Sequence, residues 1–516
     1  MLTVRRTINA QARTRGGDTF VIEPELKREL TFGQLRAGAD ELAARFDASG
    51  IAPRAKVAFL LDNGAWIVRL LLGIMAANRV AVPLNAVAGR TQLRYVLDHS
   101  DAELVFVAPR HRDKLDGLLS GIGRDIDVVV VSAEQGPQWA PGDSAEAGAA
   151  AAPPPEETDP ALLLYTSGST GLPKGALLSH RAVVSGGRNV VAGHALSAAD
   201  RALCVLPVYH INGAMVTVCA PLCSGGGVVM PQRFSAGLFW KMAAEYRCTW
   251  SSVVPTIIKY LLDRAAQGHE PFRFGRDPRL RNFRFGRSAS APLPAVVLRE
   301  WERVFGVPMI ETLGLTETAG TVATNPMPPA ERKAGSVGVA CGSRIAVIDP
   351  GPGARHLPAG APGEIAVCGA NLLDRYYKNE PATRAAFVDG WFRTGDLGFL
   401  DGDGYLFITG RLKELIIRGG ENIAPREIDD ALYRHEAVLE AAAVGVEHAD
   451  YGQEVVACVA LRDGFSCSER ELMEFCAQSV GAVKSPKAIY FLDELPKGPS
   501  GKILRLQLPK VIASLN

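Results

Sequence analysis

The sequence predicts an α/β protein in which a large N-terminal α/β region, with layered sheets and a β-rich subdomain, precedes a small C-terminal α+β domain. Helical and strand patterns alternate over residues 31–110, as they do in parallel α/β layers. Residues 335–410 are rich in Val, Ile, Gly and Pro and contain turns such as "DGDGY", which indicates the β-rich subdomain. The composition changes again after Gly410, so we expect the two domains to span 1–410 and 411–516.

The first expected element is a helix, because Ile8 and Ala12 lie one turn apart; the arginines of this stretch leave a transit peptide as the alternative. A second helix follows over 31–46, with Thr31 as its N-cap. Further along the N-terminal region we expect helices at 65–77 and 90–100 and strands at 56–61, 80–85 and 102–109.

An Ala/Pro/acid-rich patch at 141–159 predicts an exposed loop, after which the α/β alternation resumes to about residue 330. In the C-terminal domain, the pattern predicts helices at 424–435 and 468–479 and strands at 440–446 and 454–461.

The composition narrows the functional class. The formal net charge of +1 over 516 residues shows no basic excess, so we expect no nucleic-acid partner. Nine cysteines are scattered singly with no C-x-x-C pair, which is typical of reduced thiols in a cytoplasmic protein. We expect no transmembrane segment, because the longest apolar candidate, "WIVRLLLGIMAA", is short and contains Arg69.

The stretch "YTSGSTGLPKGAL", Tyr165–Leu177, joins a short apolar strand to a helix that begins after Ser179. Its glycines let backbone N–H groups approach a ligand, its hydroxyls add donors and Lys174 adds a positive charge, a combination that suits phosphate oxygens. A flexible polar linker is the alternative. The stretch is not a P-loop, because Lys174 follows a proline instead of a glycine.

Six stretches occur in order: "YTSGSTGLPKG", "LPVYHING" (206–213), "ETLGLTET" (311–318), "WFRTGDLG" (391–398), "GRLKELIIRGGENIAPREI" (410–428) and "LPKGPSGKILR" (495–505). Together they resemble the adenylate-forming superfamily of acyl-CoA synthetases, luciferases and nonribosomal peptide adenylation domains. "RGGENIAP" resembles the CoA-side loop of the acyl-CoA synthetases. The resemblance implies an ATP-dependent carboxylate–CoA ligase: the acid forms an acyl-AMP with release of pyrophosphate, and the thiol of CoA then displaces AMP. ATP, Mg²⁺ and CoA are the cofactors and co-substrates it implies.

The resemblance also implies roles for individual residues. The catalytic residues would be Lys502, Glu317, Thr166 and His210, with Glu317 on the magnesium ion. The phosphate loop would consist of Thr166, Ser167, Gly168, Ser169, Thr170, Gly171 and Lys174. The adenine and α-phosphate region would draw on Ser288, Ala289, Ser290, Thr312, Leu313, Gly314, Leu315 and Thr316. Leu313 departs from the family, which commonly has an aromatic residue there; we expect adenine to pack by apolar contact instead.

Three further sets of residues follow from the resemblance. Asp396 would accept from both ribose hydroxyls, with Arg411 as its partner at the ribose. Lys413 would be the hinge about which a mobile C-terminal domain rotates between the two half-reactions, and Lys502 would reach the acyl carboxylate and the α-phosphate. The pantetheine tunnel of CoA would be lined by Gly419 and Gly420.

The sequence specifies the carboxylic acid substrate less well than the nucleotide. The acyl pocket would draw on His210, Asn212, Met215 and Arg287, and the run "FGRSASAPL" resembles that of ligases for small acids such as oxalate. Arg287 is open to two interpretations: it meets a second anionic group of the substrate, or it belongs to a structural ion pair. The first predicts a short or medium, polar or dianionic acid.

Four alternatives stay open at this stage: a fatty acid–CoA ligase, an aromatic acid–CoA ligase, an acyl-AMP ligase that loads a carrier protein, and a nucleotide-binding sensor that has lost catalysis. We expect a monomer or a homodimer.

Overall fold

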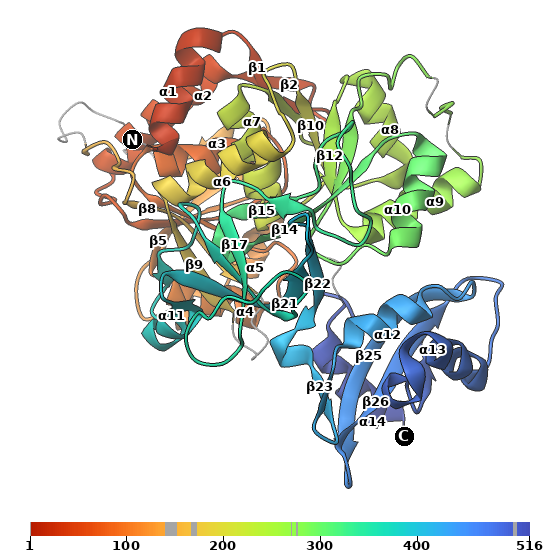
Figure 1. The fold of residues 1–516 in the computed structure, drawn as a ribbon. Coiled ribbons are helices and arrows are strands. Elements are labelled where there is room, and N and C mark those ends of the chain that lie inside the picture. The colour runs from red at the N-terminus through yellow and green to blue at the C-terminus, as the bar shows by residue number, and fades with distance from the viewer. Residues whose placement is uncertain are drawn as a thin grey trace.

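The computed structural model describes residues 2–139, 152–166, 173–269, 271–274, 277–498 and 503–515. The fold contains two large sheets, a small β region and a C-terminal unit (Figure 1). The expected loop at 141–159 lies mostly outside the described residues.

The first large sheet has eight strands, and its centre is parallel as the alternating pattern predicts. In spatial order the strands are β19 (Arg375–Tyr376), β9 (Lys174–Ser179), β8 (Pro160–Thr166), β4 (Val80–Pro83), β3 (Lys56–Leu60), β5 (Ala102–Val107), β6 (Asp127–Ser132) and β7 (Gly136–Gln138). Its outer face is covered by α4 (Arg90–His99), α5 (Arg112–Leu115) and the 3₁₀ turns η1 (Pro109–His111) and η2 (Leu119–Gly121).

The second large sheet has nine strands, again with a parallel centre. The strands are β16 (Val339–Ala340), β15 (Gly320–Thr324), β14 (Met309–Leu315), β13 (Phe285–Ser288), β12 (Trp250–Val253), β10 (Arg201–Cys204), β11 (Gly227–Val229), β1 (Thr19–Glu23) and β2 (Arg28–Thr31). Its outer face is covered by α8 (Ala236–Glu245), α9 (Pro255–Ala266) and α10 (Ala295–Phe305), around Trp240 and Trp301.

Helices fill the space between the two sheets. They are α1 (Val4–Arg15), α2 (Phe32–Ala48), α3 (Ala65–Ala76), α6 (His180–Gly193), the π-helical η3 (Asn212–Cys219) and α7 (Ala220–Ser224). α6 contacts β8 and β9 of one sheet and β15 of the other. The predicted N-caps are confirmed: Thr31 caps α2 with a capping box, and the Ser179 side chain accepts from the Ala182 N–H.

The β-rich region expected at 335–410 is a sheet of antiparallel strands. It contains β17 (Arg344–Ile348), β18 (Gly363–Cys368), β21 (Trp391–Leu400), β20 (Phe387–Val388) and β22 (Leu406–Arg411). The short helix α11 (Glu380–Ala386) precedes β20, and the 3₁₀ turn η4 (Thr316–Thr318) connects β14 to β15.

The C-terminal unit, residues 416–515, is joined to the rest of the chain through β22 and the 3₁₀ turn η5 (Leu412–Glu414), and it lies at the bottom of Figure 1. Its sheet contains β24 (Glu421–Ile423), β23 (Ile416–Arg418), β26 (Gly452–Leu461), β25 (Val438–His448) and β27 (Ile489–Phe491). The helices are α12 (Pro425–Leu432), α13 (Glu469–Lys484), α14 (Leu508–Leu515) and the turn η6 (Arg505–Gln507).

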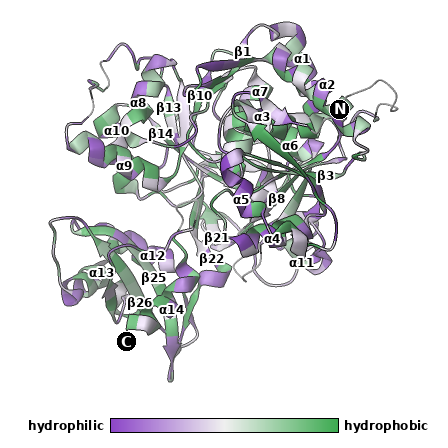
Figure 2. Ribbon diagram, turned by 180° about the vertical axis from the view of Figure 1, so that it is seen from behind, coloured by the Kyte–Doolittle hydropathy of each residue, from purple (hydrophilic) through white to green (hydrophobic). Residues whose placement is uncertain are grey.

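Figure 2 shows apolar residues along the sheets and the inner helices and polar residues around the periphery. α3 is buried over nearly its whole length, with Trp66 and Arg69 as its two residues that are not fully buried. Across the described ranges, no helix combines the length and apolar character that crossing a membrane requires.

Candidate active site

Three of the residues singled out in the sequence lie at one edge of the nine-stranded sheet. Ser288 ends β13, Glu317 follows β14, and His210 follows β10 after a short loop. The carboxyl ends of parallel strands meet at the same edge, which is where ligands bind in open α/β sheets. The strand order therefore assembles a candidate site from segments about a hundred residues apart in the sequence.

Three side chains connect the two large sheets at this edge. Lys174 begins β9 opposite Thr166, the last residue of β8. The Lys174 Nζ lies 5.1 Å from the ring centre of Tyr376, and the Tyr376 hydroxyl donates to Glu317 Oε1 at 2.9 Å. Burial, together with the Glu317 charge, raises the pKa of Tyr376, so this hydroxyl stays a donor. Sequence reasoning missed Tyr376, because nothing in "DRYYKN" distinguishes a site tyrosine from one that only packs.

The backbone around Tyr376 is held from both sides. The Leu373 N–H donates to the Glu317 carbonyl at 2.7 Å, and the Tyr377 N–H donates to the Gly175 carbonyl at 2.8 Å. This segment therefore ties the turn that carries Glu317 to the strand that begins at Lys174, and a carboxylate and an ammonium group are presented to the same space.

Asp396 and Arg411 form an ion pair on the small β region. They are cross-strand partners in β21 and β22, and Arg411 Nε lies 2.6 Å from Asp396 Oδ1. The Asp396 charge raises the pKa of Arg411, and Glu317 contributes in the same direction. The Asp396 side chain is 5% exposed and that of Arg411 is 43% exposed. The pair thus has a rigid buried acid and an accessible cation.

The turn before Asp396 is fixed by hydrogen bonds. The Thr394 hydroxyl accepts from the Asp396 N–H at 3.1 Å, and Glu364 Oε1 accepts from the Gly395 N–H at 3.1 Å. Gly395 has φ +72°, which glycine adopts without strain. The direction of the Asp396 carboxylate is therefore set by its own turn.

The segment expected to line adenine follows β13. The Ala289 N–H donates to the Val253 carbonyl at 3.3 Å, and the Thr312 hydroxyl donates to the Ser288 carbonyl at 3.3 Å. Ser290 has φ +73°, which is uncommon for a residue with a side chain, and its hydroxyl accepts from Asn212 at 3.4 Å. Left-handed backbone of this kind is concentrated at functional sites.

β14 carries the other residues of this set. Leu313 packs into the core of the small β region with Val322 and Ile365, and Leu315 lies against the same cluster. Gly314 packs against the carbonyl of Gly320, so a larger residue would not fit there. Contact of Leu313 with adenine stays a prediction.

Arg287 lies in the interior between the two large sheets, where its side chain is 1% exposed. Its Nη1 donates to Ser252 Oγ at 2.9 Å and to Asn212 Oδ1 at 3.1 Å, and its Nη2 donates to Thr321 Oγ1 at 2.9 Å. Burial lowers the pKa of Arg287 to about 9. Its Nε is buried without a hydrogen-bond partner, and none of the described carboxylates lies within ion-pair distance. The structural ion pair considered for Arg287 therefore has no acidic member in the described parts of the chain.

His210 and Met215 lie beside this cluster. His210 precedes the π-helical turn that carries Asn212 and Met215, and such turns are frequent at functional sites. Burial lowers the pKa of His210 to about 4, and its Nε2 has no partner among the described groups. His210 is therefore neutral near pH 7. Its Nε2 can form a hydrogen bond with a ligand but brings no positive charge to it.

The C-terminal residues of the candidate site are partly described. Lys413 lies in η5, and Gly419 and Gly420 form the turn between β23 and β24 with φ +57° and +85°. A side chain at Gly420 would meet no atom within 4 Å, so this turn is open. Ser167, Gly168, Ser169, Thr170, Gly171 and Lys502 lie outside the described residues.

One further acid went unnoticed in the sequence. Glu311, on β14, is 4% exposed and accepts from the Gly335 N–H at 3.1 Å. Burial raises its pKa to about 7, while Arg426 on α12 opposes this effect and Asp430 on α12 adds to it. A single acid in an otherwise apolar strand was the only available signal, and it does not reveal which residues will cover it.

The charged groups at this edge fit a magnesium–triphosphate ligand. No cluster of three or more His, Cys, Asp and Glu side chains is found among the described residues, and Glu317 is the one carboxylate presented beside Lys174. Mg²⁺ is usually bound through one or two carboxylates together with substrate phosphates, so a single glutamate is a suitable donor set.

Two family models match the chain over most of its length. The family model described as "AMP-binding enzyme" matches residues 8–377, and the model described as "AMP-binding enzyme C-terminal domain" matches residues 427–502.

Two curated relatives and one solved structure show the extent of the likeness. The chain is 47% identical to the sulfoacetate–CoA ligase of Cupriavidus necator, over 95% of this chain and 94% of the relative. It is 34% identical to the oxalate–CoA ligase of Arabidopsis thaliana, over 93% of each chain. Its fold is similar to that of ATP-bound MatB from Rhodopseudomonas palustris, with a TM-score of 0.88, 29% identity and coverage of 98% and 99% of the two chains.

Replacing Asp396 tests the nucleotide site. Asp396→Ala removes the carboxylate that we expect to accept from the ribose hydroxyls, and hydrogen bonds to a charged group contribute about 1.5–3 kcal/mol each, so ATP affinity should fall at least tenfold. Isothermal titration calorimetry measures this, with Asp127→Ala, on an exposed position of β6, as the matched control. Unchanged ATP affinity in a folded Asp396→Ala variant would contradict the assignment.

Glu311 makes stability depend on pH. Its pKa rises from 4.5 to about 7 on folding, so in this interval the folded chain holds a proton that the unfolded chain has released, and stability falls as pH rises. Glu311→Gln keeps the acceptor for Gly335 and removes the titration. We expect it to be more stable than the parent by about 2 kcal/mol at pH 8 and by less at pH 5.5. Urea unfolding at both pH values checks this, with Glu103→Gln as control; an equal difference at the two pH values would refute it.

Proposed function

The chain belongs to the AMP-binding enzyme family, as an ATP-dependent carboxylate–CoA ligase, and we propose that its acid is a short one with a second anionic group, a sulfonate or a carboxylate. The observation that carries the proposal is the buried guanidinium of Arg287. All of its hydrogen-bond partners among the described residues are neutral. A buried charge without a counter-charge costs several kcal/mol. An anionic substrate group would supply the counter-charge.

The position of Arg287 supports this substrate class. Asn212 contacts Arg287 and Ser290, so the cation lies one side chain away from the segment after β13 and from His210. A second anion there would place the reacting carboxylate of a short acid toward the sheet edge, where Lys174 and Glu317 lie. Sulfoacetate and oxalate, the acids after which the two curated ligases are named, are of this kind.

We assign the steps to residues as follows. Lys174 and Thr166 hold the leaving phosphates, Asp396 accepts from the ribose hydroxyls and Arg411 faces the ribose from the exposed side of the pair. Lys502 stabilises the charge that develops on the α-phosphate as the carboxylate attacks it. Glu317, oriented by Tyr376, would hold Mg²⁺, which neutralises phosphate charge when bound. The neutral His210 positions the acyl group without taking a proton.

We further propose two domains, 1–410 and 411–516, with the second rotating about Lys413 between the half-reactions. A lysine between the carboxylate and the α-phosphate occupies the space that the thiol needs later, so one face of the second domain has to replace the other. The nine unpaired cysteines support a cytoplasmic setting, and we propose a monomer or a homodimer.

A panel of acids tests the function. Pyrophosphate release is measured with sulfoacetate, oxalate, malonate, propionate, octanoate and benzoate, each with and without CoA, and with a pantetheinylated carrier protein in place of CoA. Release and thioester formation should be fastest with the short dianionic acids and CoA. Preference for octanoate or benzoate would favour a fatty or aromatic acid ligase, preference for the carrier would favour an acyl-AMP ligase, and no turnover with any acid would favour a nucleotide sensor.

Arg287→Met tests the second anion, because methionine keeps the apolar stem and removes the charge. We expect kcat/KM for sulfoacetate or oxalate to fall by about tenfold to a hundredfold, whereas propionate is spared. Arg281→Met, at an exposed position before β13, is the matched control. Equal losses for diacids and monocarboxylates in a folded variant would leave Arg287 as a structural residue.

The two half-reactions test the proposed rotation. Lys502→Ala should cripple acyl-AMP formation and largely spare thioester formation from pre-made acyl-AMP, since it removes charge stabilisation from the first step only. Gly420→Leu should do the reverse by obstructing the pantetheine path. Lys510→Ala and Gly464→Leu are the matched controls, because Gly464 also has a positive φ and open space around it. If each substitution slows both half-reactions equally, the rotation is wrong.

A further inference from the structure

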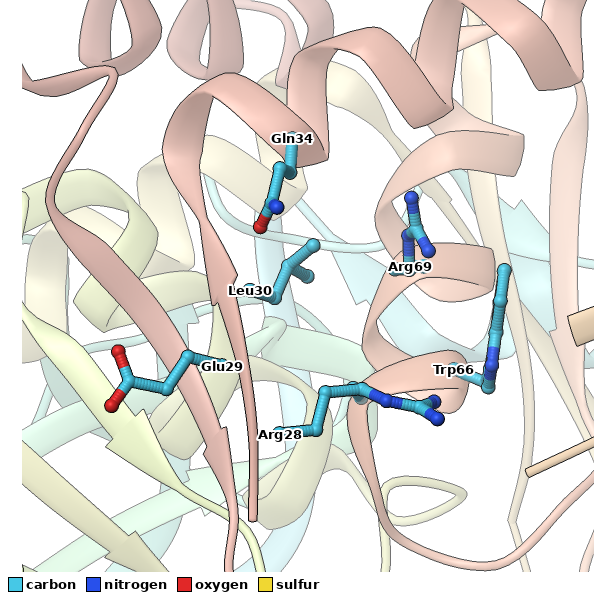
Figure 3. Close-up of a pocket in the computed structure, with 7 residues that line it drawn as sticks. Arg28, Glu29, Leu30, Gln34, Trp66 and Arg69 are labelled. Carbon is cyan, nitrogen blue, oxygen red and sulfur yellow. The ribbon is translucent and has the colours of Figure 1, made fainter. Parts of the chain in front are cut away.

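A cavity of about 270 Å³ opens between β2, α2 and α3, outside the site described above (Figure 3). In Figure 1 these elements lie at the upper end of the molecule, whereas β21 and β22 lie in its lower half. Trp66 and Arg69, the two residues of α3 that are not fully buried, both line the cavity. The two side chains of α3 that are not fully buried in the core therefore face the cavity.

Two guanidinium groups share the cavity without a carboxylate between them. Arg28 is held by the carbonyls of Ala133 and Glu134. Arg69 stacks on the Trp66 ring with its Cζ 4.4 Å from the ring centre, and it forms neither a hydrogen bond nor an ion pair with the described residues. Burial lowers the pKa of Arg69, the Glu41 charge opposes this effect, and the Arg28 charge adds to it. Two like charges thus face one space and repel each other.

The acid that lines the cavity does not neutralise them. Glu29 accepts from the Thr19 hydroxyl at 2.6 Å, and in Figure 3 its carboxylate points away from both guanidinium groups. The indole N–H of Trp66 is buried and has no hydrogen-bond partner in the described parts of the chain. The walls therefore offer donors from a strand and from a helix, next to the apolar side chain of Leu30.

We propose that this cavity binds the phosphate head group of a small metabolite or inorganic phosphate itself. Its donors approach from different elements, and a phosphate accepts hydrogen bonds in several directions, whereas a carboxylate accepts close to one plane. Arginine suits phosphate because its planar fork is weakly hydrated and donates two bonds at once. An anion between Arg28 and Arg69 would relieve their repulsion, and the carbonyls that hold Arg28 keep it in place beforehand.

Equilibrium dialysis tests the site with inorganic phosphate, glycerol phosphate and succinate as probes. Since phosphate also suits the nucleotide site, binding is compared in the parent, in Arg28→Gln, in Arg69→Met and in Lys174→Met, which removes the cation proposed to hold the leaving phosphates, with Arg13→Gln on α1 as surface control. Arg69→Met keeps an apolar stem at this position and removes the guanidinium group that stacks on Trp66. Acid-dependent pyrophosphate release should stay within about twofold in both cavity variants, which shows that they are folded.

The proposal predicts that phosphate binding weakens at least about tenfold in Arg28→Gln and Arg69→Met and persists in Lys174→Met and Arg13→Gln. Tighter binding of glycerol phosphate than of inorganic phosphate identifies a phosphorylated metabolite, and the reverse identifies free phosphate. Unchanged binding in both cavity variants, loss in Lys174→Met alone, or binding of succinate but not of phosphate would overturn it. If Arg69→Met fails to fold, Arg28→Gln decides alone.

Discussion

The packing of α6 between the two large sheets fixes the spacing of the groups that these sheets bring to the candidate active site. α6 contacts β8 and β9 on one side and β15 on the other, so it sets the distance between the hairpin that carries Lys174 and the turn that carries Glu317. Gly186 on this helix lies directly against the carbonyl of Ala319, and an added methyl group would collide with it. Glycine is needed at this contact because only a residue without a side chain lets the helix and the turn approach so closely.

The charged residues of the candidate site have two kinds of environment. At the sheet edge, Asp396 with Arg411 and Glu317 with Tyr376 are joined directly, so their orientation is set before a ligand arrives. Such preorganisation lowers the cost of aligning charges around a triphosphate. In the interior, Arg287 has only hydroxyl and amide acceptors among the described residues. Three neutral acceptors surround this charge and offset part of the cost of burying it.

The link to the C-terminal unit is anchored by an ion pair at each end. Arg411 is held by Asp396 on β21, and Glu414 lies 3.3 Å from the guanidinium of Arg505, which also pairs with the buried Asp429 at 2.5 Å. Leu412 and Lys413 remain between these two anchors, which is where we place the proposed hinge. A rotation about this link would move the C-terminal unit as one body, because Arg505, in the turn before α14, pairs with Asp429 on α12 and with Glu414 of the link.

The sequence by itself determined the α/β class, the alternating elements and the caps at Thr31 and Ser179, because apolar periodicity and capping depend on residues within a few positions of each other. It also determined the family, since six motifs in order need no knowledge of the fold. Tertiary structure alone decided that Tyr376 meets Glu317, that Arg287 has neutral hydrogen-bond partners, and that the buried Glu311 feels the charges of Arg426 and Asp430 on α12. These contacts depend on strand order and helix packing between segments far apart in the chain, and no local pattern records which side chains such packing will bring together.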